Sequence, residues 1–324
     1  MPVWLSKRDV ASLLNMKRTL KTVEEVYRAH GEGNAVVPGK ITLDMSKAGA
    51  DGWMNSMPAF VAPMDAAGIK FAGGFIHNPE KEGLPYVMAT ILLIDPRTGA
   101  LKAAMDGYQI TIDRTGAAPA VAAKYLKPRV RVVGIVGAGA VGRAAAEAFD
   151  QMFDLKEIRI QDISESAANA AQDALRGRLK APLVVSRTAA ACVAGAEVVV
   201  TATHAKTPLF SKKDIVPGCV LFPMGSFTEL DPEVVLGAGA RIVDHLEQNM
   251  HRGEFMPYFR DGKLAESDIY AEIGEIVAGK KAVPNTGEKP VVASLIGVGS
   301  LDIALAMQIH GEAEARGLGV RFEQ

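Results

Sequence analysis

The fold of this chain is decided by the stretch Val130-Arg131-Val132-Val133-Gly134-Ile135-Val136-Gly137-Ala138-Gly139-Ala140-Val141-Gly142. Its first half is a nearly continuous apolar run, which is typical of a strand covered on both faces. Its second half has the spacing GxGxxG and opens an alanine-rich, helix-length segment. In this setting Gly137 allows a tight turn, Gly139 lets the backbone approach a pyrophosphate, and Gly142 permits close helix–strand packing. The stretch therefore predicts a dinucleotide-binding turn, with the helix N-terminus facing the phosphates.

The next predicted strand supplies the acid that such a turn requires. Asp162 follows Gly142 by 20 residues, where a carboxylate accepts hydrogen bonds from the ribose hydroxyls. Its charge repels a 2′-phosphate, and Ile163 and Ser164 bring no arginine to neutralise one. We therefore expect NAD(H) as the preferred cofactor, with NADP(H) as the alternative. The candidate cofactor-binding residues are Gly137, Ala138, Gly139, Ala140, Val141, Gly142, Asp162, Ile163, Thr115, Thr201, Ala202, Thr203, Met224, Gly225, Ser226 and Gly297.

Strand and helix patterns alternate from Arg129 onward. Short apolar runs at residues 158–160, 183–185, 198–200, 220–222 and 242–243 are separated by alanine-rich segments. This alternation predicts an α/β fold, with a Rossmann domain built on a doubly wound parallel sheet at residues 127–289. We expect residues 1–126, completed by about residues 290–324, to form a second domain of the α+β type.

The first region combines helix signals with strand and turn signals. Ser6 and Asp9 resemble a helix N-cap with its partner acid, and a second helix begins near Asn15 and ends near Gly33. Residues 41–43, 69–71 and 87–94 indicate strands, and strand and turn signals continue to Ile112. Helices are predicted at residues 116–126 and at about residues 300–311.

Composition excludes several classes of protein. The formal charge is −1, from 36 basic and 37 acidic residues, so no basic field is present to bind nucleic acid. The two cysteines, Cys192 and Cys219, exclude a disulfide framework and a cysteine-rich zinc site, and the histidines form no metal-spaced pair. Because the N-terminus has no apolar signal core and no apolar run reaches membrane-spanning length, we expect a cytoplasmic protein with no membrane partner.

Several longer motifs resemble the ornithine cyclodeaminase/mu-crystallin family, which includes alanine dehydrogenases and ketimine reductases. The resemblance covers nearly the whole chain. It rests on Gly83-Leu84-Pro85-Tyr86-Val87-Met88-Ala89, Met105-Asp106-Gly107, Arg114-Thr115-Gly116-Ala117, Ala123-Lys124-Tyr125-Leu126, Glu229-Leu230-Asp231-Pro232 and Ala271-Glu272-Ile273-Gly274-Glu275-Ile276-Val277-Ala278-Gly279.

The resemblance implies a homodimer formed through the N-terminal domain and an active site in the cleft beside the Rossmann domain. It implies hydride transfer between a nicotinamide and the α-carbon of a small amino or imino acid. Such a substrate carries a carboxylate, which a partly buried site matches with cations. Lys70 corresponds to the family's substrate lysine, Arg114 to the arginine between substrate and cofactor, and Lys40 to an arginine that binds the carboxylate. A Lys70 with a pKa lowered by burial could also polarise the imine or pass a proton.

Three departures from the family fall near the substrate. The segment Pro223-Met224-Gly225-Ser226-Phe227-Thr228-Glu229-Leu230 is short and lacks the aspartate that the cyclodeaminases and the related alanine dehydrogenase usually carry. The mu-crystallin branch also lacks this aspartate. Tyr86 stands where threonine is common, close to the substrate lysine, so we include it among the candidate catalytic residues. Lys40 replaces arginine and gives up bidentate geometry. Asp231 or Asp113 could supply the lost acid, although Asp231 fits a helix N-cap better.

Three functions remain open at this point. The favoured one is an NAD(P)H-dependent oxidoreductase acting on the C–N bond of α-imino or α-amino acids, of the imine or ketimine reductase or amino-acid dehydrogenase type. The second is an ornithine cyclodeaminase, a lyase that releases ammonia and forms proline. The third is a crystallin-like, nucleotide-dependent ligand binder without catalysis, which the retained cations Lys70 and Arg114 argue against.

Overall fold

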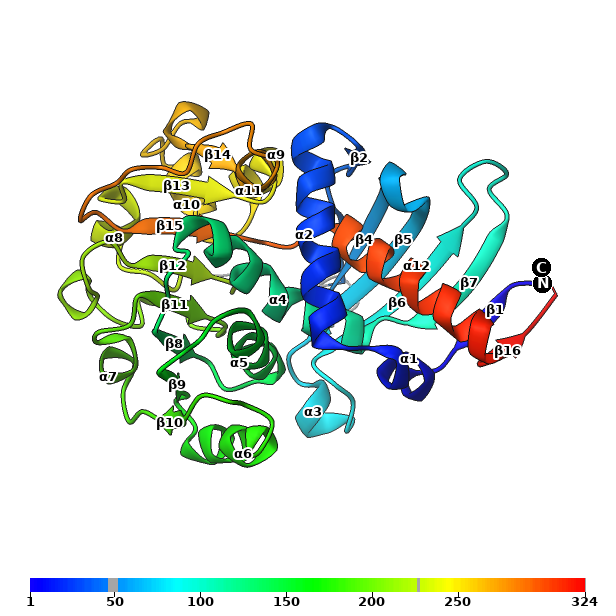
Figure 1. Cartoon of the computed structure of the whole chain (residues 1–324), viewed down its shortest axis with the longest axis horizontal. Coiled ribbons are helices and arrows are strands. Elements are labelled where there is room, and N and C mark those ends of the chain that lie inside the picture. Colours follow the sequence, from blue (N-terminus) through cyan, green and yellow to red (C-terminus); the bar gives the residue numbers. More distant parts are fainter. Residues whose placement is uncertain (46–51, 226–227, 324) are drawn as a thin grey trace. The chain divides into compact units, whose positions relative to one another are not determined.

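The computed structural model describes residues 1–45, 52–225 and 228–323. The chain divides into two compact units (Figure 1), Met1–Arg114 with Val298–Gln324, and Thr115–Gly297. The sequence placed the boundaries at 126/127 and near 290. In the structure the first crossing falls inside a helix, and a strand at 291–294 carries the second unit past residue 290.

The first unit is a mixed sheet with helices on one face. Its elements are β1 (Val3–Leu5), α1 (Lys7–Leu13), α2 (Met16–Glu32), β2 (Ala35–Val36), β3 (Ile41–Asp44), β4 (Gly52–Val61), η2 (Ala62–Met64), β5 (Ala66–Phe75), α3 (Asn78–Lys81), β6 (Val87–Ile94), β7 (Leu101–Asp106), the first part of α4 (Tyr108–Leu126), α12 (Gly299–Arg316) and β16 (Val320–Arg321). The strand order is β16-β1-β7-β6-β5-β4-β2, and β3 also pairs with β4. Strands β1 and β7 are parallel, whereas the other pairs are antiparallel.

The helix ends of this unit follow the sequence signals. The Ser6 hydroxyl accepts from the Asp9 N–H while the Asp9 carboxylate accepts from the Ser6 N–H, which confirms the capping box of α1. Asn15 caps α2, whose apolar side buries Leu20 and Val23. The helix ends at Gly33, where φ is +79°.

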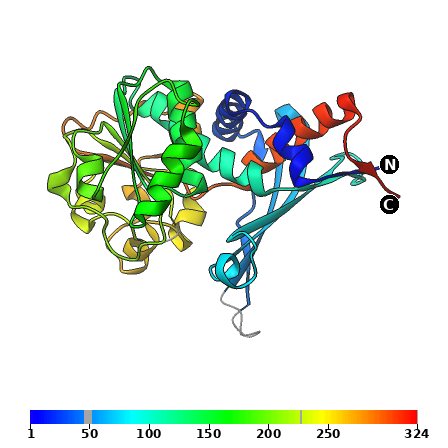
Figure 2. The same ribbon diagram turned by 90° about the horizontal axis from the view of Figure 1, so that it is seen from below.

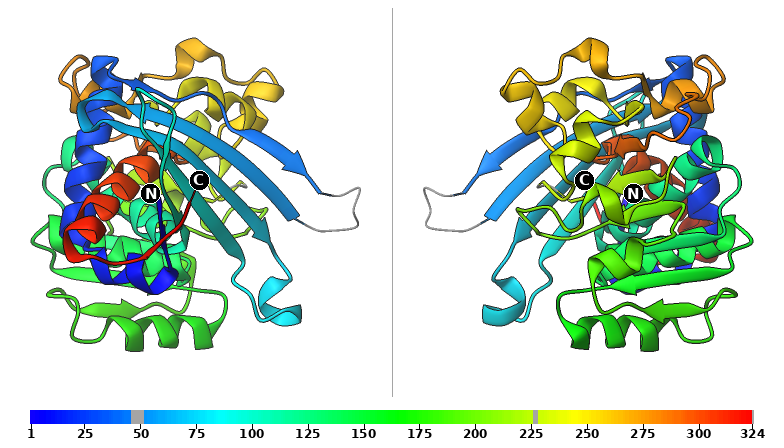
Figure 3. Two further views of the ribbon diagram at one scale, coloured as in Figure 1. Left: turned by 90° about the vertical axis from the view of Figure 1, so that its right-hand side faces the viewer. Right: turned by 90° about the vertical axis from the view of Figure 1, so that its left-hand side faces the viewer.

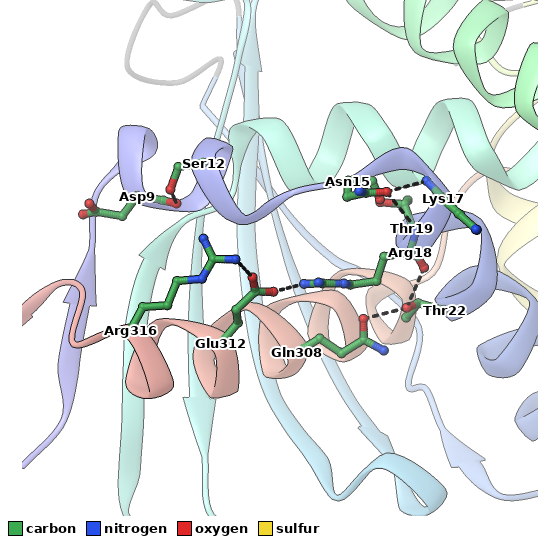
Figure 4. Close-up of polar contacts among 10 residues, drawn as sticks. All are labelled: Asp9, Ser12, Asn15, Lys17, Arg18, Thr19, Thr22, Gln308, Glu312 and Arg316. Carbon is green, nitrogen blue, oxygen red and sulfur yellow. Dashed lines mark hydrogen bonds and ion pairs between the residues drawn. The ribbon is translucent and has the colours of Figure 1, made fainter.

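Helices α2 and α12 cover one face of this sheet, as Figures 2 and 3 show. Helix α12 packs on β4, β5 and β6, and α2 packs on α12. An ion pair and a hydrogen bond join α2 and α12 (Figure 4). Glu312 binds both Arg18 and Arg316, and the Thr22 hydroxyl donates to Gln308 at 2.8 Å.

The sheet register sorts side chains onto two faces. Met105, Ile91, Lys70 and Met57 are successive cross-strand partners, and all four are buried on the face that the helices cover. Lys70 therefore lies in the core layer of the first unit.

The opposite face is not covered by these helices. Trp4, Ala104, Leu92, Ile69 and Pro58 are successive partners across it. We define the open face by the exposed or partly exposed side chains of this register: Trp4, Ile41, Leu43, Met54, Ser56, Pro58, Ile69, Phe71, Met88, Thr90 and Leu92.

Helix α4 begins earlier than the sequence predicted. Strand and turn signals were expected to continue to Ile112 and the helix to begin at Gly116, but α4 begins at Tyr108. The β-branched residues Ile110, Thr111 and Ile112 favour strand locally. The Asp106 carboxylate instead accepts from the Tyr108 N–H at 3.0 Å, and Ile110 is fully buried, so tertiary packing overrides local propensity.

The second unit confirms the predicted Rossmann sheet. Its elements are the rest of α4, β8 (Val132–Val136), α5 (Ala140–Met152), β9 (Glu157–Gln161), α6 (Glu165–Leu175), β10 (Leu183–Val185), α7 (Ala189–Val193), β11 (Val198–Thr201), η3 (Lys212–Asp214), β12 (Val220–Pro223), α8 (Pro232–Leu236), β13 (Ala240–Val243), α9 (Leu246–His251), α10 (Met256–Arg260), η4 (Glu266–Asp268), β14 (Ala271–Glu272), α11 (Ile273–Val277) and β15 (Val291–Ser294). The order β10-β9-β8-β11-β12-β15-β13-β14 is parallel throughout. The strand order reverses between β8 and β11, which is where such sheets bind ligands.

Candidate functional site

The glycine loop between β8 and α5 has the geometry that its sequence predicts. Gly137 has φ +109°, and a Cβ there would lie 2.4 Å from the Ala202 carbonyl oxygen. A Cβ at Gly142 would lie 1.9 Å from the Gly137 carbonyl oxygen. The turn and the close packing of α5 on β8 therefore both require glycine.

The middle glycine differs from the other two. A Cβ at Gly139 would meet no atom within 4 Å, and Gly139 caps α5 without a side-chain hydrogen bond. The first N–H groups of an α-helix have no partner within the helix, and they carry the positive end of its dipole. Open space in front of such a helix end fits a pyrophosphate.

Asp162 lies directly against this loop. Its Oδ2 accepts from the Ala138 N–H at 2.8 Å, and its Oδ1 accepts from the Ser164 N–H at 2.9 Å. Ile163 beside it is fully exposed. The structure thus brings Asp162 to the loop, as the spacing predicted.

The ends of β11 and β12 are joined by a buried glutamate that the sequence interpretation left without a role. Glu229 Oε2 accepts from the Thr201 hydroxyl and from the Gly225 N–H, both at 2.8 Å. Its Oε1 accepts from the N–H and the hydroxyl of Thr203, at 2.8 and 2.6 Å. One side chain therefore holds both candidate cofactor segments at the carboxyl edge of the sheet.

A second buried acid supports the first. The Glu254 carboxylate accepts from the backbone N–H groups of Glu229 and Leu230, at 2.8 and 3.3 Å. The pKa of Glu254 is raised to about 7, because burial and the nearby Glu229 charge outweigh the two backbone hydrogen bonds that favour its ionised form. Burial also raises the pKa of Glu229, against the four hydrogen bonds that favour its ionised form.

The remaining cofactor candidates are spread over the second unit. The Met224 N–H donates to the Thr201 carbonyl at 2.8 Å, and the Gly297 N–H donates to the Asp244 carboxylate at 2.6 Å. Thr115 lies within α4. Ser226 lies outside the described residues.

In the first unit, the structure brings Lys70 and Arg114 together around an acid that the sequence interpretation missed. Asp302 Oδ1 lies 2.7 Å from Lys70 Nζ and 3.1 Å from Arg114 Nε. Lys70 also donates to the Thr111 hydroxyl at 3.3 Å. Lys70 and Asp302 are fully buried, and Arg114 is 6% exposed. Three ionisable groups from β5, α4 and α12 thus form one cluster, here called the buried trio.

Electrostatics in the trio favour a net positive charge. The pKa of Lys70 is lowered to about 8, because burial and the Arg114 charge together outweigh the opposing effect of Asp302. Burial alone would raise the pKa of Asp302, but Arg114 and Lys70 outweigh it and hold that pKa below its usual value. With Lys70 and Arg114 protonated and Asp302 ionised, the trio has two positive charges and one negative charge.

One signal could have identified Asp302. It stands between Leu301 and Ile303 near the start of a helix that was expected to be apolar, and a charge in such a position is rarely buried without a partner. The sequence alone could not name that partner, because Lys70 precedes Asp302 by more than two hundred residues.

The other two candidate catalytic residues, Lys40 and Tyr86, directly precede strands β3 and β6 of the first unit. Next to Lys40, Ile41 is the first residue of β3 and pairs with Ser56 of β4. The Tyr86 carbonyl accepts from the Phe75 N–H, five residues along β5 from Lys70, so the backbone of Tyr86 is not adjacent to that of Lys70.

The acids considered as substitutes for the family aspartate are engaged elsewhere. Asp231 caps α8 by accepting from the Glu233 N–H at 2.9 Å, which confirms its N-cap role. Asp113 accepts from the Gln109 side-chain amide at 2.7 Å. Glu229 is occupied by its four donors, so it too is committed to structure.

The chain is similar in sequence and in structure to several known proteins. The model of the ornithine cyclodeaminase/mu-crystallin family matches residues 2–317. An alanine dehydrogenase of Archaeoglobus fulgidus is 32% identical over 98% of this chain and 97% of its own length. The Thermococcus litoralis Δ1-pyrroline-2-carboxylate reductase, solved with NADH and L-proline, superposes with a TM-score of 0.92 at 28% identity, covering 99% of this chain and 100% of that chain. An archaeal alanine dehydrogenase dimer with bound NAD gives 0.92 at 31% identity, covering 99% of each chain.

The fold, the glycine loop and these likenesses define an NAD(P)-dependent oxidoreductase that acts on C–N bonds. The chain belongs to the ornithine cyclodeaminase/mu-crystallin family.

Proposed function

We propose that this protein is an NADH-dependent reductase of small α-imino acids. The observation that carries the proposal is the convergence of Lys70 and Arg114 on one buried acid, which leaves a cationic cluster suited to a carboxylate. Lys40, directly before β3 of the same sheet, would add a third cation. The relatives named for alanine dehydrogenase and for pyrroline-2-carboxylate reductase support a substrate of this class.

The residues of the chain hold and orient the reactants. The glycine loop and Asp162 would hold the dinucleotide, and Thr201, Thr203 and Gly225 would line its nicotinamide end. A bound nicotinamide would supply a hydride to the carbon of the protonated imine, whose C=N π electrons become the lone pair of the amine nitrogen. Arg114 and Lys70 would fix the substrate carboxylate, so that positioning and charge complementarity lower the barrier.

Preference for NADH over NADPH is part of the proposal. Asp162 places a carboxylate beside the loop, where a 2′-phosphate would meet a like charge. Ile163 and Ser164 offer no cation in compensation. Steady-state kinetics with each nucleotide tests this point, and a higher kcat/KM with NADPH would contradict it.

We also propose a homodimer formed through the open face of the first unit and an intracellular setting. The open face displays apolar side chains across several strands, including Ile41 at 70% and Leu43 at 59% exposure. The dimer named for the archaeal alanine dehydrogenase supports a second copy of this chain as the partner. Among the described residues, the structure has no helix both long and apolar enough to cross a membrane. The setting rests on the two unpaired, buried cysteines, which suit a reducing compartment.

The decisive experiment is an optical assay of NADH oxidation against a panel. The panel contains cyclic ketimine carboxylates of the pyrroline and piperideine type, pyruvate with ammonium or methylamine, and ornithine assayed for ammonia. We expect rapid oxidation with an imino acid and none with ornithine. Ammonia and proline from ornithine without net NADH change would replace the proposal by a cyclodeaminase. NADH binding without turnover on any compound would favour the ligand binder.

Lys70 provides the matching residue test. Lys70→Ala should lower kcat/KM on the order of 10²-fold, the usual loss for one charge-stabilising donor. Lys102→Ala removes a partly buried lysine from the same sheet, paired with Asp95, and should leave the rate unchanged. Wild-type turnover in Lys70→Ala would remove Lys70 from the active site.

A further inference from the structure

The bonding pattern around Asp302 sets it apart from an ordinary structural ion pair. A single oxygen, Oδ1, accepts from both Lys70 and Arg114, whereas the fully buried Oδ2 has no hydrogen-bond partner in the described part of the chain. A carboxylate that served only to neutralise arginine would be expected to use both oxygens side-on. Asp302 instead divides one oxygen between two cations.

This pattern leaves donors available on both cations. Arg114 binds Asp302 through Nε, and its two terminal amino groups donate no hydrogen bond to the residues that the structure describes. Lys70 uses two of its three protons, on Asp302 and Thr111. The terminal pair of a guanidinium is suited to bidentate binding of a carboxylate.

From this geometry we propose that Asp302 is a positioning residue, which orients Arg114 through Nε and keeps Lys70 charged so that both can bind the substrate carboxylate. The inference rests on the proposed function. Asp302 acts through Lys70 and Arg114 and touches no reacting atom. With Asp302 ionised, the trio carries one net positive charge, which matches a substrate with a single carboxylate.

The surroundings of Lys70 leave Asp302 as the group that sustains its charge. Arg114 from α4 opposes protonation of Lys70, and Asp302 from α12 favours it. The two residues that pair with Lys70 across the sheet, Met57 on β4 and Ile91 on β6, are uncharged. His30 of α2 binds the Ser300 hydroxyl, in the same turn of α12, at 2.7 Å.

The test compares Asp302→Asn with wild type in two measurements. The first is the pH profile of kcat/KM for the imino acid. Loss of the carboxylate removes the interaction that raises the pKa of Lys70, so the alkaline limb should move to lower pH. Misplacement of Arg114 should lower kcat/KM on the order of 10²-fold. The second is the titration of the Lys70 13Cε signal by NMR, assigned by its absence in Lys70→Arg. It should also move to lower pH, and it needs no substrate.

Two further variants guard against simple misfolding. Asp302→Glu keeps the charge but displaces it, so it should retain the wild-type alkaline limb while kcat/KM falls. Glu312→Gln is the matched control, because Glu312 lies on the same helix and also bridges two cations, Arg18 and Arg316 (Figure 4). It should leave the pH profile and the rate unchanged.

The outcomes separate this inference from the proposed function. An unchanged Lys70 titration in folded Asp302→Asn, or an unchanged alkaline limb, would overturn the positioning role. If Asp302→Asn does not fold, an Asp302→Glu variant with wild-type kcat/KM would overturn it instead. Wild-type protein that reduces no imino acid would refute the proposed function, and the NMR titration would still decide whether Asp302 controls Lys70.

Discussion

The glycines of the loop differ in the reason why each position holds glycine. Gly142 is fixed by packing, since a side chain there would overlap the Gly137 carbonyl oxygen. Gly139 has open space, and its φ of −66° suits any residue, so folding does not require glycine there. The two positions therefore separate a structural requirement from a binding requirement.

This difference gives a paired prediction. Gly139→Ala should leave the melting temperature unchanged but raise the Kd for NADH at least about tenfold, equivalent to 1.4 kcal/mol, because its methyl group enters the pyrophosphate space. Gly142→Ala should instead destabilise the protein by about 1–3 kcal/mol, as overpacking does. Fluorescence titration and thermal unfolding measure both effects. Wild-type NADH affinity in Gly139→Ala would mean that the pyrophosphate does not pass this residue.

At the scale of elements, two buried acids determine how the ends of β11 and β12 are held. Glu229 joins Thr201 and Thr203 after one strand to Gly225 after the next. Glu254 holds the backbone of Glu229 in turn. The loops that we propose to line the nicotinamide are therefore fixed by carboxylates behind them.

Glu254 should make stability depend on pH. Its pKa in the folded chain is about 7, against an ordinary 4.5, so the folded state binds this proton more tightly than the unfolded state. Its stabilising contribution is complete below the ordinary value and is lost as pH rises through about 7. The shift corresponds to roughly 3 kcal/mol. Between these pH values, the melting temperature of the wild type should fall relative to that of Glu254→Gln.

The control for this prediction is Glu266→Gln. Glu266 is exposed, so this variant should follow the wild type at every pH. If the melting temperatures of the wild type and of Glu254→Gln change with pH in the same way, Glu254 does not bind its proton as tightly as proposed.

At the scale of the whole molecule, the first unit has an open face that helices α2 and α12 do not cover. The double variant Ile41→Glu with Leu43→Glu should convert the dimer to a monomer, because it places two charges in the proposed interface. Both side chains are exposed within one chain, so the fold of the monomer should be little affected. Analytical ultracentrifugation measures the change.

A similar substitution on the second unit tests whether loss of the dimer is specific to the open face. Leu236→Glu replaces a side chain that is 40% exposed on α8 of the second unit and should leave the dimer intact. A wild-type protein that sediments as a monomer, or a double variant that remains dimeric, would place the interface elsewhere or remove it.

Much of the nucleotide half could be predicted from the sequence. The strand at β8, the glycine loop and Asp162 lie within one short stretch of chain, so their spacing alone carries the geometry. The capping box at Ser6 and Asp9 and the N-cap at Asp231 are equally local. Cys192 and Cys219 remain buried and unpaired, as composition suggested.

Only the tertiary structure decided the rest. Asp302 joins Lys70 and Arg114 through contacts between residues far apart in sequence, and Glu229 gains its role from donors on two strands. Helix α4 begins early because burial of Ile110 outweighs the strand preference of its β-branched neighbours. Residue spacing determines the geometry of motifs whose residues are close together in sequence. Contacts between residues far apart in sequence depend on how the elements pack, and no local pattern specifies that packing.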